Sequence, residues 1–477
     1  MTNSNLIKII SSLSKDEMRD LEDFIISPYF NKKPTITNLF KELKKYYPDY
    51  KSEDTVKEKI YAKIYPGKKF NDGILRNQMS ELYRLVLKFI GIEGFNRENF
   101  EFRVHISKEL LNRGLQKTFV NNYEDIKREL EKNDKIQNEY YYFNRAILDE
   151  QNEDNLIFSN EVKVPVNNLY GNNFLYFTLI KLFKIMHNLH ATEVNLNVYY
   201  DKSILRKFIS FIDIEKVLDS IKEVSVKDHK IVSIYYYMSR SLIDFKDNES
   251  FLKFYDLIEN NYQLFAEGER FTLYIYLNNI ASHNIVGKQK LLDIYKSMLN
   301  KKIYKFNEKA YLSHVLFSYI LTNAIHKKEL KWLEGFIDEY IPELEPENQE
   351  NMMNYSKAHL FFQNKDHNRS LEHLMKVKAD NFFFKHQTYK LIIQNYYELK
   401  DDVQIEFAID NFRHFISKGN LSDDWKYYYN NFITAVKELI KLRSGKEKSK
   451  FKIESVIDNN IGDYSWIEEH IKNLKHS

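Results

Sequence analysis

Histidines are the side chains of this chain whose spacing comes closest to a reactive site. His187 and His190 are three residues apart, so on a helix they share one face, as metal ligands do. The sequence offers no third ligand, and the apolar residues around the pair favour half-buried packing instead. His359, His367 and His373 are close in sequence, but they fall on the two sides of an expected turn and point in different directions. We therefore predict no metal site and no catalytic histidine cluster.

Motifs of the common enzyme classes do not occur in the sequence. Ser444-Gly445-Lys446 lacks the preceding glycine of a phosphate-binding loop, and no HExxH, GxSxG or GxGxxG motif is present. The absence of cysteine excludes disulfides, thiolate metal sites and thiol catalysis. The sequence thus predicts a non-enzymatic protein with no catalytic residue, no cofactor and no metal. A hidden enzyme would need titratable residues that converge in one pocket.

A basic run is the sequence's one sign of nucleic-acid binding. Residues Lys437 to Lys452 include seven basic and two acidic side chains. The whole chain is almost neutral, with 71 Lys and Arg residues against 68 Asp and Glu residues, whereas DNA-binding proteins usually carry a clear basic excess. We expect DNA or RNA to bind with a Kd weaker than about 10⁻⁵ M at physiological salt, and to bind at this run.

Composition sets the fold class of the elements that must position these side chains. Among 477 residues there are only 12 Gly and 7 Pro, but 35 Tyr and 34 Phe. A β-sandwich needs a turn signal every 8–12 residues, and doubly wound α/β folds need Gly-rich turns. The sequence therefore predicts an all-α protein with aromatic cores.

The first 94 residues predict a compact helical module of four helices. Ser14 and Glu17 form a capping box, and Pro28 ends the helix that follows. The other helices are expected at about 37–46, at 53–64, and after a cap at Asn71. Gly91 and Gly94 are expected to end the last of them. The apolar face predicted for that helix consists of Ile74, Met79, Leu82, Leu85, Val86 and Phe89.

Three short motifs of this module carry a resemblance. Ser27-Pro28-Tyr29-Phe30-Asn31 precedes a turn at Pro66-Gly67-Lys68 and a helix with Met79-Ser80-Glu81-Leu82. In these motifs the chain resembles a group of uncharacterised bacterial helical proteins, over residues 14–90 and loosely over the last hundred residues. The resemblance implies no activity. Tyr29 and Phe30 have two interpretations, as core aromatics that fix a turn or as an exposed docking tip.

The second half of the chain repeats one pattern about every 40 residues, which is the spacing of helical hairpins. In each repeat a short polar turn is followed by apolar residues at helical spacing. The predicted turns are Lys246-Asp247, Gly287-Lys288, Lys327-Lys328, Lys365-Asp366 and Lys400-Asp401. One hairpin cannot bury its own apolar face, so such units pack on their neighbours.

Residues 347–378 resemble a tetratricopeptide (TPR) repeat most closely. The residues at that family's small and aromatic positions are Ala358, Phe361, Ser370, Leu374 and Val377. Lys357 stands where the family prefers Leu, and most repeats here exceed the family's length. The resemblance therefore implies a degenerate, TPR-like α-solenoid, with Phe361 and Leu374 buried between hairpins.

The predicted organisation has three parts. A helical module covers 1–94, a repeat array covers 98–442 and is clearest over 229–417, and a basic segment with a capping helix covers 443–477. Within the array, segments 100–114, 119–150, 172–190 and 202–222 are expected to be helical. Stretch 151–170, which contains Val162, Val164, Pro165 and Val166, is expected to be a loop. The last helices are predicted around Trp425, Phe432, Val436 and Leu439, and around Trp466, Ile467 and Ile471.

The first helix of each hairpin lines the inner face of a TPR-like array. Polar or amphipathic residues on these helices, which could hold a peptide by hydrogen bonds, are Arg240, Asn278, Asn323, His359 and Tyr396. The sequence therefore predicts a scaffold or adaptor that binds a protein or peptide, with nucleic-acid binding by the array as the alternative. No secretory signal and no 18-residue apolar stretch is visible, so a cytoplasmic location without membrane insertion is expected.

Overall fold

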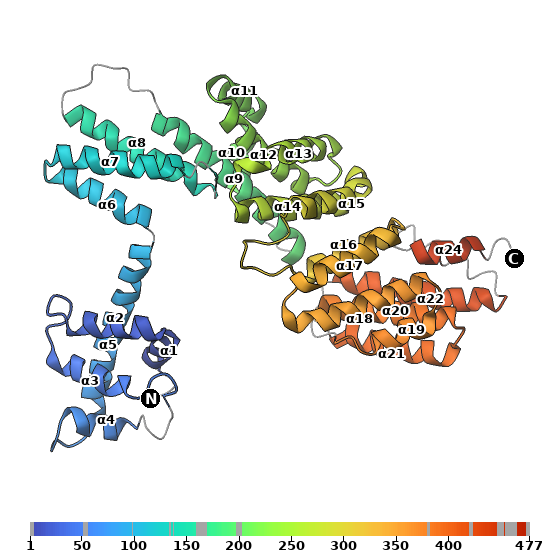
Figure 1. The fold of residues 1–477 in the computed structure, drawn as a ribbon, viewed down its shortest axis with the longest axis horizontal. Helices are drawn as coiled ribbons and strands as arrows, with labels where there is room; N and C mark the ends of the chain where they lie inside the picture. The colour runs from blue at the N-terminus through green and yellow to red at the C-terminus, as the bar shows by residue number, and fades with distance from the viewer. Residues whose placement is uncertain are drawn as a thin grey trace. The chain divides into compact units, whose positions relative to one another are not determined.

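The regular structure of this protein is helical. A computed structural model describes residues 4–50, 56–97, 99–132, 135–136, 138–158, 169–196, 203–378, 382–418, 423–445, 453 and 465–473. Figure 1 shows helices along most of these ranges. Within them, extended pairing is confined to two isolated bridges, Ile136 with Phe265 and Leu312 with Leu344. The chain is therefore all-α, as its composition predicts.

The chain divides into two compact units. The first unit comprises residues 1–134 and 143–173, and the second comprises 135–142 and 174–477. Two helices, α8 and α9, contribute residues to both. The helices of the first unit are α1 (Asn5–Ser12), α2 (Lys15–Ile26), α3 (Pro34–Lys44), α4 (Lys57–Ile64), α5 (Asp72–Arg97), α6 (Asn99–Asn112), α7 (Gln116–Lys132) and most of α8 (Tyr140–Phe158).

Local signals position the helices of the first unit as the sequence predicts. The Ser14 hydroxyl accepts from the Glu17 N–H at 3.1 Å, and the Glu17 carboxylate accepts from the Ser14 N–H at 2.9 Å. This reciprocal capping box begins α2. Asn71 caps α5 by accepting from the Ile74 N–H at 3.1 Å. Helices α1 to α5 enclose one core, which includes Leu21, Leu39, Phe40 and Leu82.

Three expectations for this region are wrong. The structure adds a fifth helix, α1, whose N-terminus is capped by Ser4. Helix α5 continues through Gly91 and Gly94 to Arg97, because neither glycine adopts a positive φ and a glycine costs a helix only about 1 kcal/mol. Ile74 is exposed, and Leu75 takes the buried position instead.

The two aromatics of the Ser-Pro-Tyr-Phe-Asn motif have different environments. The Phe30 ring stacks on Phe24 with the ring centroids 4.0 Å apart and packs against the core. Tyr29, by contrast, is 82% exposed. Each interpretation of the motif therefore fits one of its aromatics.

A second core of the first unit lies among α6, α7 and α8. Phe119, Tyr123, Ile126 and Leu148 form it. The predicted loop at 151–170 is wrong at both ends, since α8 extends to Phe158 and the next helix begins at Leu169. Residues 151–158 therefore belong to the last turns of α8, and residues 169–170 belong to the first turn of α9. The valines and the proline on which that prediction rested lie outside the described residues.

The second unit is built mainly from helical hairpins. Its elements are α9 (Leu169–Leu196), α10 (Ile204–Ser210), α11 (Ile214–Val224), α12 (Val226–Ile243), α13 (Asn248–Asn261), η1 (Tyr262–Leu264), α14 (Glu267–His283), α15 (Ile285–Asn300), α16 (His314–His326), α17 (Leu330–Tyr340), η2 (Ile341–Glu343), α18 (Pro346–Gln363), α19 (His367–Leu374), α20 (Phe382–Glu398), α21 (Asp402–Lys418), α22 (Asp423–Arg443) and α24 (Ser465–Asn473). Helices that follow one another in sequence pack together from α11 to α22.

Lysines, in place of glycines, close three of the predicted turns. Lys328, Lys365 and Lys400 adopt φ values of 59°, 60° and 57° just past the ends of α16, α18 and α20. At Lys365, the N–H bonds to the Phe362 carbonyl at 3.0 Å, and the Asp366 N–H bonds to the Phe361 carbonyl at 2.9 Å. This is a Schellman motif, which usually uses glycine. A lysine charge at a helix C-terminus is favourable, which offsets part of the cost of a left-handed conformation.

The turn predicted at Gly287-Lys288 is wrong. The turn lies at Asn284, which caps α15 by accepting from the Gly287 N–H at 2.8 Å. Gly287 belongs to the first turn of α15, where a Cβ atom would stand 2.5 Å from the Ala281 Cα atom. The glycine is therefore needed for close approach of two backbones and not for a turn.

Gly287→Ala is expected to destabilise the second unit by about 1–3 kcal/mol, because the added methyl group must displace the backbone of α14. Gly335→Ala is the matched control, since Gly335 lies on α17 with nothing within 4 Å of its Cβ position. Alanine should stabilise that site by roughly 0.5–1 kcal/mol. Urea unfolding followed by tryptophan fluorescence measures both. Equal effects of the two changes would contradict this interpretation.

Buried asparagines connect successive hairpins. The Asn284 amide donates to the Phe245 carbonyl at 2.8 Å and to Asn248 at 2.9 Å, so it connects the start of α15 to the turn between α12 and α13. Asn395 of α20 likewise donates to the Ser370 hydroxyl of α19 at 2.9 Å. Both side chains are fully buried. These bonds fix the position of each hairpin on the preceding one.

Three of the residues predicted to form the interior of segment 347–378 are buried in the structure. Ala358, Ser370 and Leu374 are buried, and the Ser370 hydroxyl donates to the Ala358 carbonyl at 2.8 Å. The expected burial is confirmed for Leu374 but not for Phe361, which is half-buried and stacks on His373 at 5.4 Å. The first and second helices of this hairpin therefore meet through small residues.

A buried ionic cluster connects Glu139 with helices α9, α12 and α14. The Lys184 ammonium of α9 lies 2.7 Å from Glu139 and 2.9 Å from Glu269 of α14. Lys181 lies 2.9 Å from Glu139, and the Tyr235 hydroxyl donates to Glu269. Burial would raise the pKa of Glu139, but hydrogen bonds from Lys184 and Lys181 outweigh it and lower that pKa to about 2.

The predicted C-terminal helices are present as α22 and α24. Phe432, Val436 and Leu439 of α22 are buried with Ile467 and Ile471 of α24 in one core. The Trp466 indole donates to Glu398 of α20 at 2.8 Å. Helix α24 therefore covers the end of the hairpin series. Across the described residues, no helix combines the length and apolarity that crossing a membrane would require.

Candidate binding site on helices α11 to α13

Three polar caps set the ends of the helices that form the candidate site. Asp213 begins α11 by accepting from the Lys216 N–H at 3.2 Å. Ser225 begins α12 by accepting from the Asp228 N–H at 3.2 Å, and Asp247 begins α13 by accepting from the Ser250 N–H at 2.9 Å. Helix α12 packs against both neighbours. The three helices therefore have fixed starts and a common apolar interior.

A cleft of about 410 Å³ is lined by residues of all three helices. Its lining combines two apolar side chains with carboxylates, amides and one lysine: Glu215, Leu218, Asp219, His229, Ser233, Tyr237, Lys253, Asp256, Leu257, Asn260 and Asn261. A volume in this range suits a small group or one long side chain of a partner.

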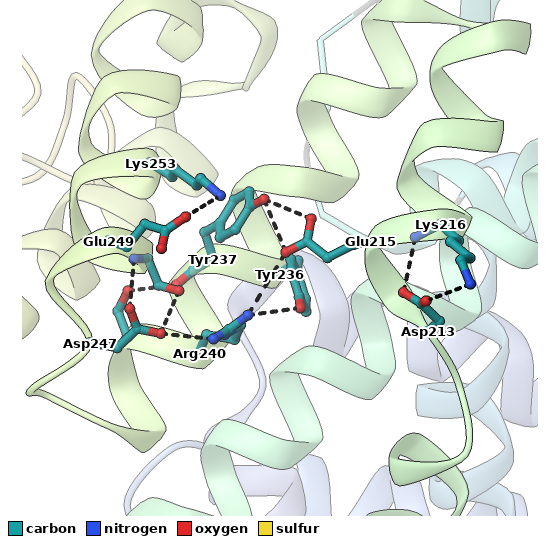
Figure 2. A network of polar contacts seen from close by, with 11 residues as sticks. Asp213, Glu215, Lys216, Tyr236, Tyr237, Arg240, Asp247, Glu249 and Lys253 are labelled. Atoms are coloured by element: carbon teal, nitrogen blue, oxygen red, sulfur yellow. Dashed lines mark hydrogen bonds and ion pairs between the residues drawn. The ribbon is translucent and has the colours of Figure 1, made fainter.

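Arg240 stands at the centre of a polar network that includes Glu215 and Tyr237 of the cleft lining (Figure 2). Its guanidinium lies 3.1 Å from Asp247 and 3.8 Å from Glu215, and it donates to the Tyr236 hydroxyl at 3.3 Å. The Tyr237 hydroxyl donates to Glu215 at 3.0 Å. This network thus connects α11, α12 and the start of α13, and within it Arg240 and Glu215 are exposed whereas Tyr237 is buried.

Burial and charge shift the pKa of several groups in this network. Burial would raise the pKa of Asp247, but hydrogen bonds from Ser250 and the charge of Arg240 lower it overall. Burial, followed by the hydrogen bond to Glu215, raises the pKa of Tyr237. The hydrogen bond to Glu249 raises the pKa of Lys253, whose ammonium lies 2.8 Å from that carboxylate. At pH 7 the network therefore contains ionised carboxylates, cations and neutral phenols.

The floor of the cleft contains a polar group with no partner. Ser233 is 1% exposed, and its hydroxyl makes no hydrogen bond with any described residue. His229 lies one turn earlier on α12, and burial, followed by the charge of Lys222, lowers its pKa, so it is neutral at pH 7. A nucleophilic serine needs a hydrogen-bonded base, and no bond joins Ser233 to His229. The geometry favours binding over acyl transfer.

A second cavity of about 410 Å³ lies near the start of α14, and most of its charges are already paired. Lys301 lies 2.7 Å from Glu259, and Lys305 lies 2.5 Å from Glu343. The Arg270 guanidinium donates to the Phe265 carbonyl at 2.8 Å. These cations are already neutralised or hydrogen-bonded, so this cavity is a weaker candidate than the cleft on α11 to α13.

Of the five residues predicted to contact a partner, Arg240 alone is exposed. All five lie on the first helices of hairpins, namely α12, α14, α16, α18 and α20. Asn278 is only 7% exposed and donates to the Met298 sulfur at 3.5 Å. The Asn278 side chain therefore packs between α14 and α15.

The other three predicted residues are half-buried. The side-chain oxygen of Asn323 and the Nε2 atom of His359 are buried without a hydrogen-bond partner. Burial, with a smaller effect of His326, lowers the pKa of His359 to about 3. Tyr396 packs against the C-terminal core. The five residues therefore do not form one surface in this structure.

Neither group of histidines forms a metal site. His187 packs edge-on against Tyr276 with its Nδ1 atom buried, while His367 contacts Asn395 and His373 contacts Asn354. Across the described ranges, no three His, Asp or Glu side chains are arranged to hold a metal ion.

Four of the seven basic residues of the run lie outside the described residues. In its described part, Lys441 pairs with Glu438 at 2.6 Å, and Arg443 pairs with Asp402 and donates to the Tyr397 carbonyl. Lys446 to Lys452 belong to the part that the structure does not describe. The two described cations at the C-terminal end of α22 therefore serve intramolecular contacts.

The cleft could not be found from the sequence, because its walls come from three helices and its signals are ordinary residues. Ser233 and His229 are four residues apart, so they share one face of α12, but this spacing does not show whether that face packs in the core or lines a cleft. Comparison of the chain with protein-family models, with curated proteins and with solved structures finds no match. Function must therefore be argued from the geometry of this site.

Proposed function

We propose that this protein is a non-enzymatic scaffold or adaptor that binds a protein partner through its second unit. The observation that carries the proposal is the accessible polar cleft on α11 to α13, whose lining residue Glu215 lies 3.8 Å from the Arg240 guanidinium. The hairpins support it further: consecutive helices pack together from α11 to α22, and the buried Asn284 and Asn395 side chains hydrogen-bond to residues of the preceding helices or turns. We further propose that these hairpins form a TPR-like array, a class of fold that most often serves binding.

The test is affinity capture from the native host with the full chain immobilised. Wild-type protein is compared with Arg240→Ala, which removes the central guanidinium of the network. The exposed pairs it loses are worth about 1 kcal/mol or less, so the fold should persist. Arg413→Ala is the control, because Arg413 is an exposed arginine of α21 with one weak contact at 3.8 Å to Asp410.

The expected result is a partner protein that wild-type and Arg413→Ala retain equally and that Arg240→Ala retains at least fivefold less. Circular dichroism of the three proteins should be superimposable. Oligonucleotide titrations at several salt concentrations form the second arm, since phosphate binding weakens steeply as salt rises. Sub-micromolar, salt-dependent oligonucleotide binding that survives deletion of residues 443–477 would replace the scaffold proposal with nucleic-acid binding.

A further inference from the structure

We propose that the cleft on α11 to α13 binds an arginine side chain from a basic segment of the partner protein, with Asp219, Asp256 and Ser233 as its ligands. This inference rests on the proposed function and specifies the chemistry of the partner. It follows from three features of the cleft: the charges that remain unpaired, the buried hydroxyl at the floor, and the geometry that these groups require of a ligand.

The charge balance of the cleft leaves two carboxylates free. Glu215 is engaged by Arg240 and Tyr237, and Lys253 is engaged by Glu249. Asp219 of α11 and Asp256 of α13 line opposite helices of the cleft, and neither side chain accepts a hydrogen bond or ion pair from a described residue. Two unpaired negative charges in one concavity attract a cation.

Ser233 supplies a third hydrogen-bond acceptor. Its presence distinguishes this cleft from a surface patch that contains carboxylates alone. Its hydroxyl lies at the cleft floor on α12, is buried, and has no partner in the described structure. Buried polar groups are nearly always hydrogen-bonded in folded proteins, so a lone hydroxyl in a concavity indicates a ligand that completes it. An N–H donor that enters between the two carboxylates would reach it.

A guanidinium matches these acceptors better than an ammonium does. It presents five N–H donors in a planar fork, so one group can bond to two carboxylates and a hydroxyl at once. His229, which also lines the cleft, is neutral at pH 7 and does not repel it. The cleft volume of about 410 Å³ admits one long side chain with its adjoining backbone.

The test is fluorescence polarisation with a labelled, end-blocked hexapeptide of alternating alanine and arginine. The reference probe replaces each arginine with citrulline, which keeps the shape and removes the charge. The full chain is used as wild type, as Asp219→Asn/Asp256→Asn and as Ser233→Ala. The control is Glu334→Gln/Glu406→Gln, which removes two exposed carboxylates of α17 and α21 and therefore the same net charge.

We expect wild type to bind the arginine peptide at least tenfold more tightly than the citrulline peptide. The double aspartate variant should lose at least tenfold in affinity, Ser233→Ala roughly tenfold, and the control less than twofold. Equal affinity for the two peptides, or equal losses in the aspartate and control variants, would overturn the assignment. Displacement of the labelled peptide by spermidine at the concentration at which unlabelled peptide displaces it would also overturn the assignment, because the site would then bind a free polyamine.

The arginine peptide should also displace the partner in the capture experiment. Retention of a partner that the peptide does not displace would overturn the arginine site and leave the proposed scaffold function intact. Loss of both peptide binding and partner capture would overturn the two together.

Discussion

Lys184→Met should destabilise the second unit by about 3–5 kcal/mol. The substitution leaves Glu269 buried with only the Tyr235 hydroxyl, and it deprives Glu139 of its closest cation. Removing one partner of a buried ion pair costs this much because an uncompensated charge stays in the interior. All three tryptophans, at positions 332, 425 and 466, lie in the second unit, so urea unfolding followed by tryptophan fluorescence reports on that unit.

Two comparisons make this result specific. Lys181→Met should cost less than about 1 kcal/mol, because the Lys181 side chain is more exposed and contacts Glu139 alone among the carboxylates. Adding Glu269→Gln to Lys184→Met should recover part of the loss, since it removes the stranded charge. A Lys184→Met variant as stable as Lys181→Met would contradict the buried cluster.

The loss should also depend on pH with a defined sign. The folded-state pKa of Glu139 is lowered from 4.5 to about 2, so its stabilisation is complete above pH 4.5 and disappears as the pH falls toward 2. The difference in unfolding free energy between wild type and Lys184→Met should therefore shrink across that interval. A difference that grows on acidification would contradict the role of Glu139.

Leu374→Ala should destabilise the second unit by about 2–5 kcal/mol. Leu374 is 2% exposed and packs with Ala358 of α18 and Leu391 of α20, so alanine leaves a cavity where three helices meet. Met375→Ala is the control on the next residue, because Met375 is exposed and its loss opens no cavity. Urea unfolding by tryptophan fluorescence measures both. A loss below about 0.5 kcal/mol at Leu374 would show that the hairpin interior is elsewhere.

The sequence by itself determined the features that depend on residues close together in the chain. The capping box at Ser14, the cap at Asn71 and the turns at Lys328, Lys365 and Lys400 involve groups within about five residues of one another. Helical spacing likewise predicted the buried position of Leu374 on α19. The all-α class followed from composition.

Only the tertiary structure decided which polar residues are available to a partner. Arg240 and Asn278 look alike in sequence, since each is a polar residue on the first helix of a hairpin. A rotation of one residue moves a side chain by about 100° around a helix, so packing against the neighbouring helix puts Arg240 in solvent and Asn278 against Met298. Which residues of a helix face a neighbouring helix and which face solvent therefore depends on contacts between helices.

Tertiary contacts also decided the features that join distant residues. Gly287 reads as a turn residue in the sequence, but the approach of α14 makes it a packing residue. Glu139 and Lys184 are 45 residues apart, and the cleft gathers Asp219, Ser233 and Asp256 from three helices. No local pattern encodes such meetings, because the energy that brings these side chains together comes from burying the apolar faces of whole helices.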